Sequence, residues 1–109
     1  MLQDVHTAKV SAKVVAAPGA NVIVAADADA YIYVHELIGD LDVNGTITIL
    51  AGSRVLAEFA LDAGQGLTEQ DEPGMDGVPR FQCRPGEAFN LTLSAGSTFR
   101  GSIDYSKRQ

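Results

Sequence analysis

Apolar and polar residues alternate along most of this chain, and no stretch repeats with the period of a helix. In the segment AFNLTLS, residues 88–94, Phe89, Leu91 and Leu93 fall on one face, and Asn90 and Thr92 fall on the other. Successive side chains of a β-strand point to opposite faces, so this pattern is typical of a strand with one buried face. Seven further segments look like strands: KVSAKVV (9–15), NVIVAA (21–26), AYIYVHELIG (30–39), GTITIL (45–50), RVLAEFAL (54–61), RFQCR (80–84) and FRGSIDY (99–105).

Period-two counting also predicts which residues of each segment face the core. It places Val22 on the same face as Val24, and Val55 on the same face as Phe59 and Leu61. A slip of one residue in register would turn such a face from the core to water, so these patterns are expected to fix strand pairing.

Turn-forming residues separate the strand-like segments. Examples are Pro18-Gly19, Asn44-Gly45, Gly52-Ser53 and Pro85-Gly86. Eight or nine short strands with turns between them indicate an all-β chain folded as a single antiparallel β-sandwich or barrel. We expect one domain over residues 1–109, with residues 1–20 as an N-terminal strand or arm. Residues 62–80 are expected to form a long loop, with room for one short strand around Leu67.

Composition excludes several classes of protein. The net charge of −6 disfavours binding to DNA or RNA, because phosphate binding needs clustered Lys and Arg. No apolar run is long enough to cross a bilayer, and the first residues lack the apolar stretch of a signal peptide, so we expect a soluble protein with no membrane contact. Cys83 is the one cysteine, which leaves no internal disulfide and no multi-cysteine zinc site.

One short motif has the form of a metal site. Asp40, Asp42, Asn44 and Gly45 follow the order D-x-D-x-N-G with which a calcium-binding EF-hand loop begins. An EF-hand also needs flanking helices and a glutamate at its twelfth position, which is Ala51 here. The flanks are strand-like, and Asn-Gly is typical of a tight turn. The motif therefore favours a turn, with a weak cation site at the two aspartates as the alternative.

No combination of residues in the sequence indicates catalysis or a cofactor. His6 and His35 are far apart, and Glu36 next to His35 would point to the other face of a strand. There is no G-x-S-x-G sequence for a nucleophilic serine, and Gly64 and Gly66 lack the helix and lysine of a phosphate-binding loop. We expect a protein that is not an enzyme, with a buried thiol at Cys83.

Two segments are candidates for contacts with other proteins. The segment AYIYVHELIG is apolar on both faces: Ile32, Val34 and Ile38 alternate with Tyr31, Tyr33 and Leu37, so its second face should pack on the rest of the sandwich or on another chain. We take Tyr31, Tyr33, His35 and Leu37 as the candidate subunit interface. The long loop carries the acidic residues Glu69, Asp71, Glu72 and Asp76, which are either solvated or a contact arm.

Three stretches resemble a family of small head-associated proteins of tailed bacteriophages. They are VNGTITILAGSRVLAEFALDAGQG (43–66), PGEAFNLTLSAGSTF (85–99) and RGSIDY (100–105), within a match from Tyr31 to Tyr105. The resemblance implies a jelly-roll-like sandwich, a homotrimer, and a role as a capsid decoration (cement) protein. The loop from Glu69 to Pro79 is longer and more acidic than the pattern of that family.

The expected function is therefore structural. The resemblance implies a protein that is made in the host cytoplasm, binds the major capsid protein of the same phage and stabilises the outer surface of the assembled head. The acidic loop is then the candidate capsid contact. The alternative is a tail-fibre or receptor-binding module that binds a glycan or protein on the host surface. Aromatic residues make up 6% of the chain and tryptophan is absent, which disfavours a glycan site.

Overall fold

The computed structural model describes residues 9–71 and 78–109, and this part of the chain consists of strands, turns and loops, with no helix. None of its described segments is therefore a helix that could cross a membrane. The strands, in chain order, are β1 (Val10–Ala16), β2 (Gly19–Val24), β3 (Tyr31–Leu41), β4 (Gly45–Ala51), β5 (Arg54–Leu61), β6 (Gly66–Gln70), β7 (Phe81–Cys83), β8 (Phe89–Leu93) and β9 (Phe99–Arg108).

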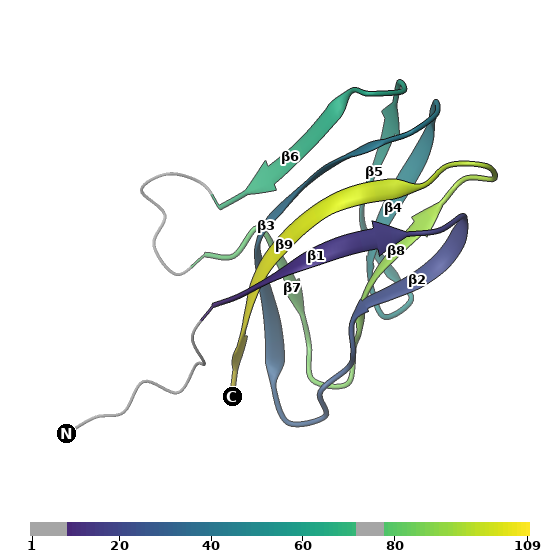
Figure 1. The fold of residues 1–109 in the computed structure, drawn as a ribbon. Helices are drawn as coiled ribbons and strands as arrows, with labels where there is room; N and C mark the ends of the chain where they lie inside the picture. Colours follow the sequence, from purple (N-terminus) through teal and green to yellow (C-terminus); the bar gives the residue numbers. More distant parts are fainter. Residues whose placement is uncertain (1–8, 72–77) are drawn as a thin grey trace.

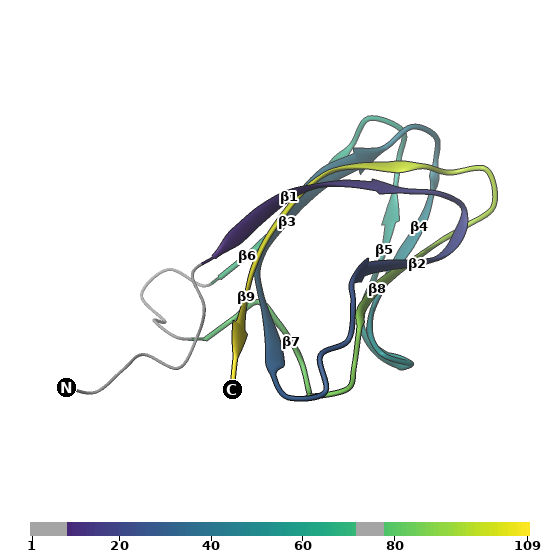
Figure 2. The same cartoon turned by 60° about the horizontal axis from the view of Figure 1, so that its bottom comes forward.

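The strands form two antiparallel sheets that pack face to face (Figures 1 and 2). The first sheet has the order β1-β9-β3-β6, and β7 also pairs with β3; the second sheet has the order β2-β8-β4-β5. Most connections carry the chain from one sheet to the other, which gives the strand order of a jelly roll. The predicted antiparallel β-sandwich is confirmed.

The segment predicted as a long loop contributes a strand of its own. β6 lies within residues 62–80 and pairs with β3, from Glu36 opposite Gln70 to Asp40 opposite Gly66. Leu67 on this strand is buried in the core. β1 likewise brings part of the predicted N-terminal arm into the first sheet, where it pairs with β9.

The core lies between the inner faces of the two sheets. Phe89 and Phe99 are its largest fully buried side chains, and the ring of Phe89 lies 6.0 Å from that of Phe81 between centroids. The inner face predicted for β8 and the burial predicted for Cys83 are confirmed. Further core residues that share this interior are Val14, Ile32, Val34, Leu41, Ile47, Ile49, Cys83, Leu91, Leu93 and Ile103.

A bulge at His35 changes the face of every later residue of β3. Val34 pairs with Tyr105 on β9, but Glu36 pairs with Asp104, so His35 is one extra residue on β3. As a result Leu37 points into the core and is fully buried, and Ile38 points outward. The expectation that Leu37 shares a face with Tyr31 and Tyr33 is therefore wrong. Simple alternation fails here because the bulge shifts it by one position.

Similar bulges occur in the two edge strands of the second sheet. In β2 the register shifts between Val22 and Val24, and in β5 it shifts at Leu56, where Leu50 pairs with Val55 and Ile49 pairs with Ala57. Val22 and Val55 point outward in consequence and are 67% and 61% exposed. The prediction that these two valines face the core is wrong for the same reason as in β3.

Candidate functional site

The four residues of the predicted subunit interface do not form one surface. Tyr31 and Tyr33 lie near the end of the first sheet, with their rings edge to face and 6.4 Å apart between centroids. The guanidinium of Arg108 lies 5.1 Å from the ring centroid of Tyr33, a cation–π contact within the chain. Leu37 lies in the core. What the structure leaves of this interface is a pair of tyrosines next to His35.

His35 joins three strands through its two ring nitrogens. Nδ1 lies 2.8 Å from Oδ2 of Asp71, which follows β6, and Nε2 lies 2.8 Å from Oγ of Ser106 on β9. The main-chain N–H of Asp71 donates to the carbonyl of His35, and the main-chain N–H of Arg80 donates to Asp71 Oδ1. One carboxylate thus connects the bulge of β3 to the two ends of the segment between β6 and β7.

The order Ser106, His35, Asp71 is that of a catalytic triad, with hydrogen-bond distances that a triad requires. A triad also needs a serine oxygen that a substrate carbonyl can reach. Ser106 is 4% exposed and sits within β9, paired with Tyr33. Its burial argues that this cluster links strands and does not perform acyl transfer.

No motif in the sequence indicates this cluster. His35 is separated from Asp71 by 36 positions and from Ser106 by 71. Only the pairing of β3 with both β6 and β9 brings the three residues together. Knowing that Glu36 pairs with Gln70 would have placed His35 beside Asp71.

The described part of the acidic segment is engaged within the chain. Glu69 forms an ion pair with Arg80, whose guanidinium also lies 4.8 Å from the ring centroid of Phe81. Asp71 accepts hydrogen bonds from His35 and from the main chain of Arg80. Glu72 and Asp76, the other members of the candidate capsid-contact loop, lie outside the described residues.

The D-x-D-x-N-G motif lies in the connection between β3 and β4, as the turn interpretation predicted, but it is not the tight turn that is typical of Asn-Gly. The connection crosses from the first sheet to the second, and neither Asn44 nor Gly45 has a positive φ. Asp42 Oδ1 accepts a hydrogen bond from the main-chain N–H of Thr98 at 2.7 Å, and Asn44 Oδ1 accepts one from Ala63 at 2.8 Å. These oxygens therefore join three neighbouring loops at one end of the sandwich. Over residues 9–71 and 78–109, no three His, Cys, Asp or Glu side chains come together as a metal site.

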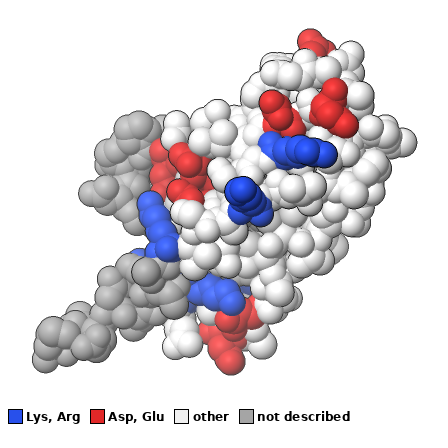
Figure 3. Space-filling model, in the orientation of Figure 1, with Lys and Arg blue, Asp and Glu red and all other residues white. Residues whose placement is uncertain are grey.

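Charged side chains are frequent on the outer face of the first sheet, where basic and acidic groups lie side by side (Figure 3). Strand pairing arranges the outward residues in rows that cross β1, β9, β3 and β6. Three successive rows are Val15-Arg100-Asp40-Gly66, Lys13-Ser102-Ile38-Thr68 and Ser11-Asp104-Glu36-Gln70. Asp104 stands opposite Glu36 and accepts a hydrogen bond from the Ser11 hydroxyl at 2.6 Å.

The outer face of the second sheet is nearly uncharged. Its two central rows, crossing β2, β8, β4 and β5, are Val22-Asn90-Leu50-Val55 and Ala20-Thr92-Thr48-Glu58. Glu58 is the one charged residue among these eight, and it accepts a hydrogen bond from the hydroxyl of Thr48 at 3.0 Å. A face of this composition differs from the usual charged surface of a globular domain.

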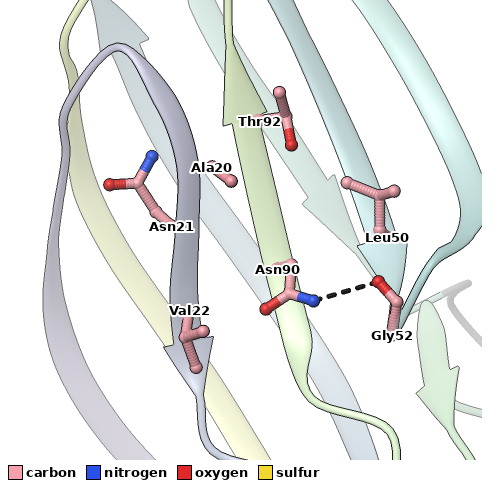
Figure 4. Close-up of a pocket in the computed structure, with 7 residues that line it drawn as sticks. All are labelled: Ala20, Asn21, Val22, Leu50, Gly52, Asn90 and Thr92. Atoms are coloured by element: carbon pink, nitrogen blue, oxygen red, sulfur yellow. Dashed lines mark hydrogen bonds between the residues drawn. The ribbon is translucent and has the colours of Figure 1, made fainter.

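A shallow hollow of about 300 Å³ lies on this uncharged face (Figure 4). Asn90 forms part of it and donates from Nδ2 to the carbonyl of Gly52 at 3.0 Å, which fixes its amide. Val55 is paired with Leu50 at the side of the hollow. The lining residues are Ala20, Asn21, Val22, Leu50, Gly52, Asn90 and Thr92.

A polar network lies at the start of β5, next to Val55. Arg54 donates from Nε and from a terminal nitrogen to the carboxylate of Glu87, the latter at 2.8 Å, and Glu87 also accepts from the main chain of Arg84. The hydrogen bond from Arg54, followed by that from Arg84, lowers the pKa of Glu87. This network joins the start of β5 to the turn before β8.

Cys83 is chemically protected. Its side chain is fully buried, and burial raises the pKa of the thiol to about 11. The thiolate is the reactive form, and the native protein therefore presents neither the ionised group nor access to it.

We expect Ellman's reagent to modify Cys83 in the native protein at least about 10³-fold more slowly than in guanidinium, because reaction requires the fold to open. The measurement is the rate of thiol release at pH 8 with and without denaturant. Rapid modification of a protein that keeps its native circular dichroism would show that Cys83 is accessible.

Comparison with known proteins gives a likeness of fold. No protein-family model matches the sequence, and no curated protein matches it. Among solved structures, the chain is similar to one from Bacillus endospore appendages, described as a novel family of disulfide-linked pili. The TM-score is 0.53 at 18% identity, over 97% of this chain and 90% of that chain. What the two chains share at this identity is the fold.

Proposed function

We propose that this chain is a structural virion protein, a homotrimeric decoration protein that binds the major capsid protein on the outside of an assembled phage head. The observation that supports it most is the contrast between the two outer faces of the sandwich. One face carries rows of mixed charges, and the other is almost uncharged. Uncharged exposed faces commonly mark protein contacts, and a molecule with two unlike faces is suited to two unlike partners.

The phage head as the place of action comes from the sequence resemblance. A trimer is suited to bind an assembled head because of multivalency. A trimer engages several weak contacts at once only where an assembled shell has already placed coat subunits around an axis, and this avidity is lost when the geometry is absent. A protein that binds only intact shells also stabilises them by mass action.

The pilus chain with the same fold is also a subunit of an assembly, which agrees with a structural role. Its pili are described as disulfide-linked. In this protein Cys83 is the one cysteine and is fully buried, so a disulfide between copies would require the fold to open. The proposed assembly therefore rests on non-covalent contacts.

Co-sedimentation with capsids tests the proposal. Labelled protein should pellet with assembled, expanded heads of the phage that encodes it and should remain in the supernatant with free coat subunits. It should also raise the temperature at which the heads break. Adsorption to host cells or their polysaccharide, without binding to heads, would contradict decoration and favour the tail-fibre alternative.

The same assay tests the acidic segment as the capsid contact. If Glu72 and Asp76 meet basic coat residues, binding should weaken as salt is added, because exposed charges are screened over about 8 Å at physiological ionic strength. Combining Glu72→Gln with Asp76→Asn should weaken binding similarly. Asp62→Asn, at an exposed position after β5, is the matched control and should leave binding unchanged.

A further inference from the structure

Two exposed valines on the second sheet owe their orientation to bulges. Without the register shifts in β2 and β5, period-two alternation would turn Val22 and Val55 toward the core. Instead they lie at the two ends of one row, Val22-Asn90-Leu50-Val55, that crosses all four strands. Bulges are a known means of re-aiming a side chain. Exposing two valines costs hydrophobic stabilisation of the monomer, which an occupant of this face would recover.

The face carries both a hollow and an exposed valine that could fill one. The hollow of about 300 Å³ lies between β2 and β4, and Val55 protrudes beside it from β5. The hollow and the exposed Val55 side chain lie next to each other on this face but do not overlap. Val55 of one copy can therefore enter the hollow of the next copy in a head-to-tail contact. Contacts of that type close into a ring when the rotation between neighbours permits.

Charge favours another copy of the chain as the occupant of this face. The protein carries a net charge of −6, so two copies repel one another across most pairs of surfaces. The outer face of the second sheet holds Glu58 alone among the eight residues of its central rows. Two such faces meet with little like-charge repulsion and little cost of removing charges from water.

The edges of the sheet are less suited to self-contact than its face. An unpaired edge strand can pair with another chain through its free N–H and C=O groups, and bulges interrupt that pattern. Both edge strands of the second sheet, β2 and β5, carry a bulge. The bulges that interrupt pairing at these edges also turn Val22 and Val55 outward.

We propose that copies of this chain associate through the outer face of the second sheet, with Val55 of one copy in the hollow lined by Val22, Leu50 and Asn90 of its neighbour. This inference rests on the multi-copy form of the proposed function. It moves the contact between copies from the tyrosines beside His35 to the opposite side of the sandwich.

Light scattering after size-exclusion chromatography, at tens of micromolar, tests the contact without any capsid. The wild-type protein should have three times the monomer mass of 11.5 kDa. Val55→Glu and Val22→Glu should each shift it to the monomer mass, because each places a carboxylate in the apolar contact. Val15→Glu is the matched control: Val15 is 70% exposed on the outer face of the first sheet, and the trimer should persist.

Circular dichroism and denaturation verify that each variant folds, and Val55→Ser is a milder replacement if Val55→Glu lowers stability. The inference is overturned if the wild-type protein is a monomer or if Val55→Glu remains a trimer. It is also overturned if Val15→Glu dissociates to the same extent as Val55→Glu. If the wild type is monomeric and Val55→Glu abolishes binding to heads, the face contacts the coat instead of another copy. A trimer that does not bind to phage heads contradicts the proposed function and leaves the inference intact.

Discussion

Replacing Phe89 with alanine should lower the free energy of unfolding by about 3–5 kcal/mol, the usual cost of truncating a buried aromatic side chain. Phe89 is fully buried at the start of β8, between the two sheets, and its ring packs near that of Phe81. Interiors are close-packed, so the neighbours cannot fill the space that is left.

Chemical denaturation measures this change, with Val15→Ala as the control. Val15 lies on the outer face of the first sheet and is 70% exposed, so its truncation should change the free energy of unfolding by no more than about 0.5 kcal/mol. Equal effects of the two substitutions would show that the inner face of the second sheet has been assigned wrongly.

Gly101→Ala should destabilise the protein by more than ordinary overpacking of a core does, which costs about 1–3 kcal/mol. Gly101 on β9 stands opposite Gly39 on β3. A Cβ at Gly101 would overlap the carbonyl oxygen of Ile38 and the Cα of Gly39, and one at Gly39 would overlap the carbonyl oxygen of Arg100 and the ring of Phe99. Backbone atoms cannot yield unless β3 and β9 separate, so we expect a large loss of folded protein.

Gly66→Ala is the matched control, because it lies in β6 of the same sheet with open space around its Cα and no left-handed φ. It should be neutral or stabilising by about 0.4–1 kcal/mol, through reduced freedom of the unfolded chain. The measurement is the unfolding midpoint in guanidinium for both variants. Near-wild-type stability of Gly101→Ala would contradict the close approach of the two strands.

The fold class could be predicted from alternation and turns because these are local properties. In β8, Phe89, Leu91 and Leu93 face the core as the pattern indicated, and the Gly52-Ser53 pair forms the turn between β4 and β5. The bulges could not be predicted in this way. A bulge depends on which partner residue stands opposite, and that is decided by strands far away in the sequence.

The same limit explains the errors at the candidate sites. Period-two counting places Leu37 on the face of Tyr33 because the two are four positions apart, and the extra residue at His35 reverses that relation. The cluster of His35 with Asp71 and Ser106 depends on β3 lying between β6 and β9. Each of these features belongs to the pairing of strands, which a single sequence does not display.

The two outer faces of the sandwich are assigned to two different partners. The uncharged face carries the proposed contacts between copies, and this leaves the mixed-charge face of the first sheet and the acidic segment after Gln70 for the shell. Copies that meet through apolar contacts should keep their association in high salt, because burial of apolar surface does not depend on screening. Binding to heads through charges should weaken under the same conditions.

Electron cryomicroscopy of the purified virion would show whether this protein decorates the head. We expect density for the sandwich in groups of three on the outer surface of the head, with Val55 of each copy against the second sheet of its neighbour. Density for the sandwich in the tail, or a complete particle that lacks it, would contradict the role as a decoration protein.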